Sequence, residues 1–276
     1  MNNIDIKSLY GLKYNPFLPN IPEEALYTLP GSEMFELRIR SMARQGGFAL
    51  ITGEPGLGKS KTLHKMAYGL EKVPDLAVGV MQRPQSRLGD FYRELGELFN
   101  VALSPANRYG GFKTLRERWI HHCQSTLFKP VLLIDEAQHV SDECLTELRI
   151  LQSHQFDSQN LLFTILCGDN RLPERFRSPE LLPLGSRIGP RLVLEPLTPD
   201  QLQEYLHFAL DQAGNSQLMS EELIRTLAGH AANNLRILNQ MAAELLNTAA
   251  VKELPKIDEA LFFQLFSPSR SRPKRN

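Results

Sequence analysis

The sequence contains little cysteine and no excess of charge of either sign. Its 3 cysteines form no Cys-x-x-Cys pair and no cysteine and histidine cluster with zinc-finger spacing, which argues against a structural zinc site. Unpaired cysteines fit a reducing cytoplasm, and Cys167, inside an apolar run, is expected to be a buried core thiol. The 31 basic and 31 acidic side chains cancel, so a large basic surface is excluded. Any contact with nucleic acid must then come from local patches.

Long apolar segments are also missing. The longest runs, such as Leu161–Cys167, are far too short to cross a bilayer as a helix. The first residues, MNNIDIKSLYGLKYNPF, have no basic region followed by an apolar one, so they do not resemble a signal peptide. We therefore expect a soluble, cytoplasmic protein.

What is present is an alternation of short apolar runs with amphipathic helical patterns between residues 47 and 196. The expected strands are 48–52, 76–81, 131–134, 161–167 and 191–195. The expected helices between them are 59–70, 88–99, 112–128 and 142–154. Strands that alternate with helices build a parallel sheet with helices on both faces, so this part is predicted to be a doubly wound α/β domain.

The flanking segments read differently from this α/β part. Residues 1–46 are expected to form an irregular lead-in and a helix that Ser32 caps and that runs to about Arg44. After Pro196 the pattern is helical only, which predicts a small helical lid domain over residues 197–266. Its helices are expected to begin at Thr198, Ser220, Asn233 or Asn234, and Ile257. Residues 267–276 are expected to be a basic, flexible tail.

A phosphate-binding loop follows the first expected strand. Residues 53–60 match the pattern G-x-x-x-x-G-K-[ST] without a mismatch, between a strand and a helix. Glycines let backbone N–H groups turn toward phosphate oxygens, and the helix start adds its positive end. Lys59 is expected to reach the β- and γ-phosphates of ATP, and the Ser60 hydroxyl to bind Mg²⁺. The residues expected to bind the nucleotide here are Gly53, Glu54, Pro55, Gly56, Leu57, Gly58, Lys59, Ser60 and Lys61.

Two acids follow the third expected strand. Val131–Ile134 is a continuous apolar run, and Asp135 and Glu136 come directly after it. Ligands of open α/β sheets bind at the carboxyl ends of the strands, so both acids should lie beside the phosphate loop. We expect Asp135 to hold Mg²⁺ and Glu136 to polarise the water that attacks the γ-phosphate.

Polar residues after the fourth strand and basic residues near the fifth could complete such a site. Asp169 and Asn170 are both candidates to orient the attacking water, and the sequence does not choose between them. Arg187 is the expected arginine finger, which would reach the nucleotide of a neighbouring subunit. Arg236, at the start of a lid helix, is expected to contact the nucleotide of its own chain. The rivals for the finger are Arg191, Arg177 and Arg175.

These residues together resemble one branch of the AAA+ ATPases, which contains general secretion pathway protein A and the transposon target-selection ATPases TniB, TnsC and Mu B. The lead-in Tyr10–Phe17, Gly46-Gly47-Phe48, Leu197-Thr198, and Arg236 with Asn239 also match that branch. The resemblance extends over about residues 8–262. It implies a P-loop AAA+ fold, ATP and Mg²⁺ as cofactors, ATP hydrolysis with low basal activity, and a homo-oligomeric ring or filament.

Two basic segments resemble the DNA-contacting loops of the transposon ATPases. They are Gln82–Arg87, after the second strand, and Asn107–Lys113. Positive side chains there would neutralise phosphates without reading bases, so binding to double-stranded DNA should be independent of sequence. The residues expected to contact DNA are Arg83, Arg87, Arg108 and Lys113.

The resemblance leaves three functions open. The leading hypothesis is an ATP-dependent regulator of DNA transposition that assembles on DNA and recruits or activates a transposase. The second is a cytoplasmic ATPase of secretion or envelope assembly, similar to general secretion pathway protein A. The third is a nucleotide switch in signalling or defence.

Overall fold

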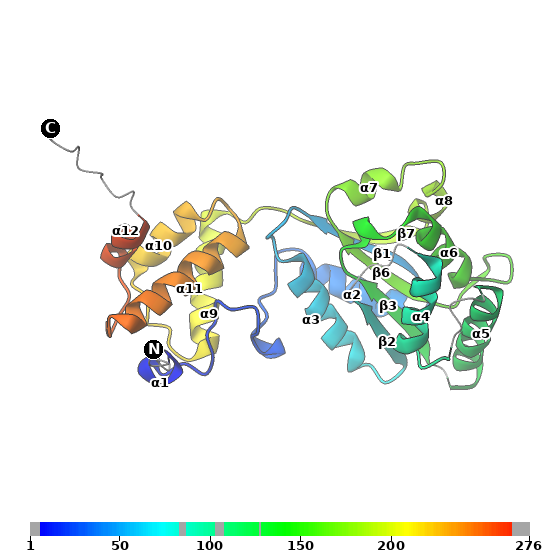
Figure 1. The fold of residues 1–276 in the computed structure, drawn as a ribbon, viewed down its shortest axis with the longest axis horizontal. Coiled ribbons are helices and arrows are strands. Elements are labelled where there is room, and N and C mark those ends of the chain that lie inside the picture. The colour runs from blue at the N-terminus through cyan, green and yellow to red at the C-terminus, as the bar shows by residue number, and fades with distance from the viewer. Residues whose placement is uncertain (1–5, 83–86, 103–107, 127, 267–276) are drawn as a thin grey trace. The chain divides into compact units, whose positions relative to one another are not determined.

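The chain folds into two compact units (Figure 1). The computed structural model describes residues 6–82, 87–102, 108–126 and 128–266. One unit runs from Thr28 to Glu195 and contains the large sheet, and the other combines the chain up to Tyr27 with the chain from Pro196. The segment expected as one lead-in, residues 1–46, therefore divides between the units. The tail expected over residues 267–276 lies outside the described residues.

A parallel sheet is the centre of the first unit. Its strands are β1 (Gly47–Gly53), β2 (Leu76–Met81), β3 (Lys129–Ile134), β6 (Phe163–Gly168) and β7 (Ile188–Leu194). They are parallel and lie in the order β2-β3-β6-β1-β7. Every residue of β1 and β6 is buried, as expected for central strands covered on both faces. Buried and exposed residues alternate along β7, which fits its place at the edge.

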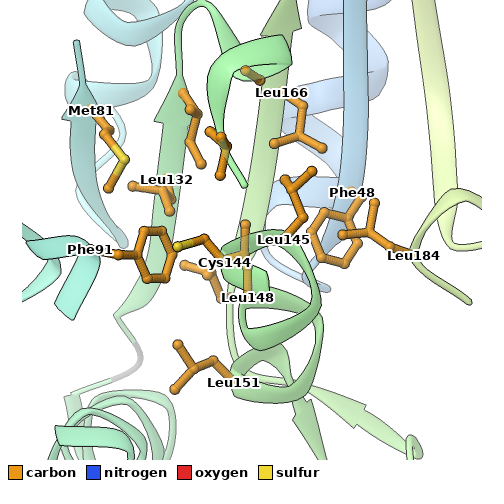
Figure 2. Close-up of a cluster of buried hydrophobic side chains, with 14 of the residues drawn as sticks. Phe48, Met81, Phe91, Leu132, Cys144, Leu145, Leu148, Leu151, Leu166 and Leu184 are labelled. Carbon is orange, nitrogen blue, oxygen red and sulfur yellow. The ribbon is translucent and has the colours of Figure 1, made fainter. Parts of the chain in front are cut away.

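Helices cover both faces of this sheet (Figure 1). On one face lie α2 (Ser32–Ala43) and α3 (Lys59–Glu71), and on the other lie α4 (Leu88–Leu98), α5 (Arg108–His121) and α6 (Asp142–Gln152). Figure 2 shows the second face, where Phe91 of α4 and Leu145 of α6 pack onto strand residues such as Leu132. These three side chains are fully buried, and full burial of such a group contributes about 1.5–3 kcal/mol.

Three details differ from the sequence-based expectations. The helix expected over 112–128 begins earlier, at Arg108, and α5 is followed by a turn of π-helix, η2 (His122–Thr126). Ser32 does not cap α2, because Gly31 holds the cap position with φ 78° and Ser32 lies buried inside the helix. The strand expected from Arg191 already begins at Ile188, since Gly189 and Pro190 hide the strand pattern.

A fourth difference concerns the end of α6. The helix expected to reach His154 stops at Gln152, and β4 (Ser153–His154) pairs antiparallel with β5 (Gln159–Asn160). Between them Gln155, Phe156 and Asp157 have φ values of 48°, 57° and 65°. Non-glycine residues rarely adopt this left-handed conformation, so the sequence gives no signal for such a tight turn.

The second unit is a bundle of helices. Its elements are α1 (Ile6–Tyr10), η1 (Glu23–Ala25), α9 (Pro199–Ala213), α10 (Glu221–His230), α11 (Leu235–Val251) and α12 (Glu259–Phe266). Thr198 forms a full capping box with Gln201 and Ser220 caps the next helix, as the sequence predicts, and of the two candidates Asn233 and Asn234 it is Asn234 that caps α11. The Asn215 side chain donates a 2.8 Å hydrogen bond to the Tyr10 carbonyl and so ties α1 to the bundle. Among the described residues, no helix is long and apolar enough to cross a membrane.

Candidate nucleotide-binding site

The sheet order brings three sequence motifs to one edge. Strand β6 lies between β3 and β1, and the registers pair Thr52 with Gly168 and Ile134 with Leu166. The phosphate-loop sequence follows β1, the two acids follow β3, and Asp169 follows β6. The carboxyl ends of parallel strands meet at one edge, which is where open α/β sheets bind their ligands.

The loop from Gly53 to Ser60 has the backbone of an anion-binding turn. Gly56 and Gly58 have φ values of 88° and 96°, and Gly58 is the residue before the first turn of α3. Gly53 is needed for a different reason, since a Cβ there would lie 2.8 Å from the Leu194 carbonyl oxygen of β7. Leu57 is 3% exposed and anchors the loop in the core. Backbone N–H groups in such a turn, together with the start of a helix, form a concave site for phosphate.

Lys59 lies folded across this loop. Its side chain is largely buried, and its ammonium group donates a 3.0 Å hydrogen bond to the Glu54 carbonyl oxygen. Ser60 is exposed in the first turn of α3, and Lys61 beside it is half-buried. The lysine is thus close to the turn whose N–H groups could hold phosphate.

Cys167 lies on β6 next to the end of β3, where Ile134 pairs with Leu166 and Asp135 follows. The thiol is fully buried on β6. Burial is the largest cause that raises its pKa, the charge of Asp135 and a hydrogen bond to that carboxylate raise it further, and the charge of Lys59 opposes them. The core position was expected from the sequence, whereas the contact with Asp135 was not, because no sequence pattern reports which strand residue faces an acid.

The two oxygen donors of the site are of the kind that binds Mg²⁺ together with a nucleotide. The Ser60 hydroxyl and the Asp135 carboxylate are hard oxygen ligands, which Mg²⁺ prefers, usually with only one or two protein ligands besides phosphates and water. Across the described residues there is no group of three or more His, Cys, Asp or Glu side chains that could bind a metal ion. The Ser60 and Asp135 oxygens fit an Mg²⁺ ion that phosphate oxygens and water also bind.

Glu136 is held by its neighbours in an uncommon backbone conformation. Its φ is 50°, and its N–H donates a 2.9 Å hydrogen bond to the Asp135 carboxylate. Its own carboxylate accepts a hydrogen bond from the side-chain amide of Gln138. The oxygen of that amide accepts a 3.2 Å hydrogen bond from the N–H of Asp169. Gln138 was missed from the sequence, since a glutamine two residues after an acid pair matches no chemical pattern.

The two candidates after β6 differ in their contacts. Asp169 accepts hydrogen bonds of 2.6–3.1 Å from the Arg171 guanidinium, which is the largest cause that lowers the pKa of Asp169. The charge of Lys59 is a smaller cause that lowers that pKa as well. Asn170 is exposed, and its side chain makes no hydrogen bond within the part of the chain described.

The four arginines considered as the finger differ in their hydrogen bonds within the chain. Arg175 donates to the carbonyls of Gln138 at 2.7 Å and Val140 at 2.8 Å, so its role is structural. Arg187 donates to the Pro183 carbonyl and the Asp157 carboxylate of its own chain. The two other candidates are exposed: Arg191 donates a 3.4 Å hydrogen bond to the Gly185 carbonyl, and Arg177 makes no side-chain hydrogen bond within the described ranges.

The other residues singled out from the sequence lie in the helical unit, beside or within α4 and α5, or outside the described residues. Arg236 is exposed at the start of α11 in the helical unit, and its expected contact with nucleotide stays a prediction. Arg83 lies outside the described residues. Arg87 is exposed at the residue before α4, Arg108 is the first residue of α5, and Lys113 is exposed 3.8 Å from Glu117.

Comparisons with known proteins agree with this geometry. Residues 41–176, from the end of α2 to α7, match the family described as "AAA domain". The chain is 29% identical over 217 residues to general secretion pathway protein A of Aeromonas hydrophila, an alignment that covers 77% of this chain and 39% of that protein. The chain thus spans well under half the length of that relative.

Several solved structures share the fold. Cdc6p from Pyrobaculum aerophilum superposes with a TM-score of 0.70 at 15% identity, over 88% of this chain and 67% of that one. The ORC2 protein of Aeropyrum pernix, with ADPNP and ADP, gives 0.71 at 14% identity, over 92% and 71%. Drosophila ORC bound to DNA gives 0.65 at 17% identity, over 94% and 64%. The α/β unit is therefore a P-loop AAA+ fold, a parallel sheet with flanking helices, and a helical unit accompanies it.

Proposed function

We propose that this AAA domain binds ATP with Mg²⁺ on the loop Gly53–Ser60 and hydrolyses it with Glu136. The observation that carries the proposal is the sheet register: β6 lies between β1 and β3, Thr52 pairs with Gly168, and Ile134 pairs with Leu166. The loop with its lysine follows β1 and Asp135 follows β3, so the basic residue of one motif and the acid of the other would lie on either side of the end of β6. That pair is what a magnesium-bound triphosphate requires.

Each residue of the site would have a distinct task. Backbone N–H groups of the loop would hold the phosphates, and Lys59 would exchange the Glu54 carbonyl for phosphate oxygens. Ser60 and Asp135 would hold Mg²⁺, which supplies positive charge to the phosphates. Glu136, exposed beside them, would accept a proton from the attacking water.

Two substitutions test binding and hydrolysis separately. Lys59→Ala should abolish most ATP binding, because it removes the charge that faces the β- and γ-phosphates, and titration with a fluorescent ATP analogue measures this. Glu136→Gln keeps the shape of the side chain and removes the base, so it should preserve ATP binding and abolish turnover. ATP affinity of Lys59→Ala equal to that of the parent protein would refute the site.

For the biological role we propose ATP-dependent regulation of DNA transposition. The chain would assemble with its own copies on double-stranded DNA when ATP is bound, and would recruit or activate a transposase. Support comes from the basic segment around Arg83 and Arg87, from the exposure of Arg87, and from the similarity of the fold to an ORC structure bound to DNA.

The DNA proposal can be tested by retention of DNA with a slowly hydrolysed ATP analogue. Arg83→Ala with Arg87→Ala should lower retention and its salt dependence, because each lost phosphate contact reduces the slope of log K against log salt by about 1. A matched control is Arg40→Ala with Arg93→Ala, which removes two exposed charges that pair with Glu36 and Asp90. Equal retention by the two double variants would refute the assignment of the DNA contacts.

A secretion or envelope-assembly ATPase is the second candidate. The 29% identity to general secretion pathway protein A over 77% of this chain favours it. In that case ATP turnover would respond to a protein partner and not to DNA. Turnover measured with and without plasmid DNA at low salt separates the two roles, since only the transposition role predicts stimulation by DNA.

A further inference from the structure

Gln138 connects the two sides of the proposed catalytic site. It lies in η3 (Ala137–His139), a single turn of 3-10 helix directly after Glu136. Ala137, the first residue of this turn, and Val140, directly after it, are 0% and 1% exposed, so the turn is anchored in the core. The Gln138 side chain is half-buried and lies between the residues that follow β3 and those that follow β6.

Its two hydrogen bonds fix which way the amide faces. The backbone N–H of Asp169 can only donate, so the group that it meets at 3.2 Å must be the amide oxygen of Gln138. The amide nitrogen then faces the Glu136 carboxylate, which can only accept when ionised. A glutamate in place of Gln138 could satisfy the first contact and would repel the second.

The surroundings leave room for this side chain and for little else. A Cβ on Gly168 would lie 2.5 Å from the Gln138 amide oxygen and 3.3 Å from its backbone nitrogen. The φ of Gly168 is not in the left-handed region, so its backbone would accept other residues. A side-chain carbon of Leu172 would lie 3.0 Å away, so the glycine is needed for space beside both Gln138 and Leu172.

Arg175 holds the backbone of the same turn. It donates to the carbonyl oxygens of Gln138 and Val140 and pairs with the Asp142 carboxylate. Because η3 is held by its backbone and by its side-chain amide, the Gln138 side chain has little freedom to turn away from Glu136.

We propose that Gln138 is a positioning residue that holds the Glu136 carboxylate in place against the end of β6. This inference rests on the proposed function, because it requires Glu136 to be the base that activates water. Gln138 does not touch the nucleotide in this role. It acts by restricting the orientations of Glu136 and by making them depend on the position of Asp169.

The test is the effect of Gln138→Ala on steady-state ATP hydrolysis. A hydrogen bond to a charged group contributes about 1.5–3 kcal/mol, so kcat should fall about 10- to 100-fold. KM and the affinity for an ATP analogue should change less than about threefold, because the phosphate loop is untouched. Gln138→Glu should lower kcat at least as much, and His139→Ala, an exposed residue of the same turn, should leave kcat unchanged.

Double variants show whether Gln138 acts through its neighbours. In a Glu136→Gln background, Gln138→Ala should not lower the residual rate further, because the group that it positions is gone. Gly168→Ala should lower kcat in the parent protein and much less in Gln138→Ala, where the 2.5 Å clash no longer exists.

The outcomes separate this inference from the proposed function. Turnover that needs Glu136 but is the same in Gln138→Ala would overturn only the role of Gln138. Equal losses from Gln138→Ala in the parent and in Glu136→Gln would also overturn it, since they would show a general structural effect. If turnover of the parent protein does not depend on Glu136, both the proposed function and the role of Gln138 are overturned.

Discussion

Gly53 lets the end of β1, where the phosphate-binding loop begins, pack closely against β7. Gly53→Ala should destabilise the α/β unit by about 1–3 kcal/mol, because the new methyl group would lie 2.8 Å from the Leu194 carbonyl oxygen and the strand would have to move. Urea unfolding followed by fluorescence measures the change, and ATP affinity should fall with it.

The matched control for Gly53 is Gly69 in α3 of the same unit. A Cβ there would meet only the ends of the Glu36 and Arg40 side chains, at 3.2 and 3.4 Å, and these can move. Gly69→Ala should therefore stabilise the helix by up to about 1 kcal/mol. Equal destabilisation by both substitutions would show that the close approach of β7 is not the cause.

A second residue-scale prediction concerns Asp169 and pH. Arg171 lowers the pKa of Asp169 below its ordinary value, so the pair stabilises the fold above that ordinary value and loses this contribution as pH falls through the lowered folded pKa. Arg171→Met should therefore reduce stability at neutral pH, and its difference from the parent should shrink in acid. Denaturation curves at a series of pH values measure this. A difference that stays constant down to the acid limit would contradict the pairing.

Larger elements were predictable where their residues form periodic patterns. The strand predicted over 76–81 has the same bounds as β2. Thr198 and Ser220 could be predicted as helix caps, since a cap depends only on a side chain and on backbone N–H groups a few residues away. The β4–β5 turn could not be predicted, since it depends on three consecutive left-handed residues. Gln138 was missed for a related reason: its side chain bonds to the backbone of Asp169, which follows β6 and is distant in the sequence.

The β4–β5 turn leads to a prediction about the finger. Asp157 lies in this turn and accepts a hydrogen bond from Arg187, so the proposed finger is held within its own chain. Asp157→Asn removes the charge of that pair, which is half-exposed and therefore weak, about 1 kcal/mol or less. If Arg187 must leave Asp157 to reach a neighbouring nucleotide, turnover should rise by up to about fivefold.

The control for Asp157 is another exposed ion pair of the same unit. Asp75 lies 3.3 Å from Arg44, at the end of the sheet where the strands begin. Asp75→Asn should leave turnover unchanged. A decrease in turnover with Asp157→Asn would show that the pair supports the active position of Arg187 and does not restrain it.

At the scale of the whole molecule, the proposed finger would join two copies of the chain. The loop, the two acids and Asp169 come from one α/β unit, and Arg187 of the same unit donates to the Pro183 carbonyl and the Asp157 carboxylate. We propose that Arg187 of one copy supplies positive charge to the transferred phosphate of the next copy.

Mixing two inactive variants tests this assembly. Arg187→Ala retains its own ATP site and lacks the finger, and Lys59→Ala retains the finger and lacks ATP binding. In a head-to-tail assembly at equal amounts, about a quarter of all sites would combine an intact ATP site with a neighbour's Arg187, so about a quarter of the parent rate should return. The control replaces Lys59→Ala by the double variant Lys59→Ala with Arg187→Ala, which has no finger to give. Recovery with that control, or none with Lys59→Ala although the proteins assemble, would show that Arg187 does not act between subunits, and the exposed Arg177 and Arg191 would be tested next in the same way.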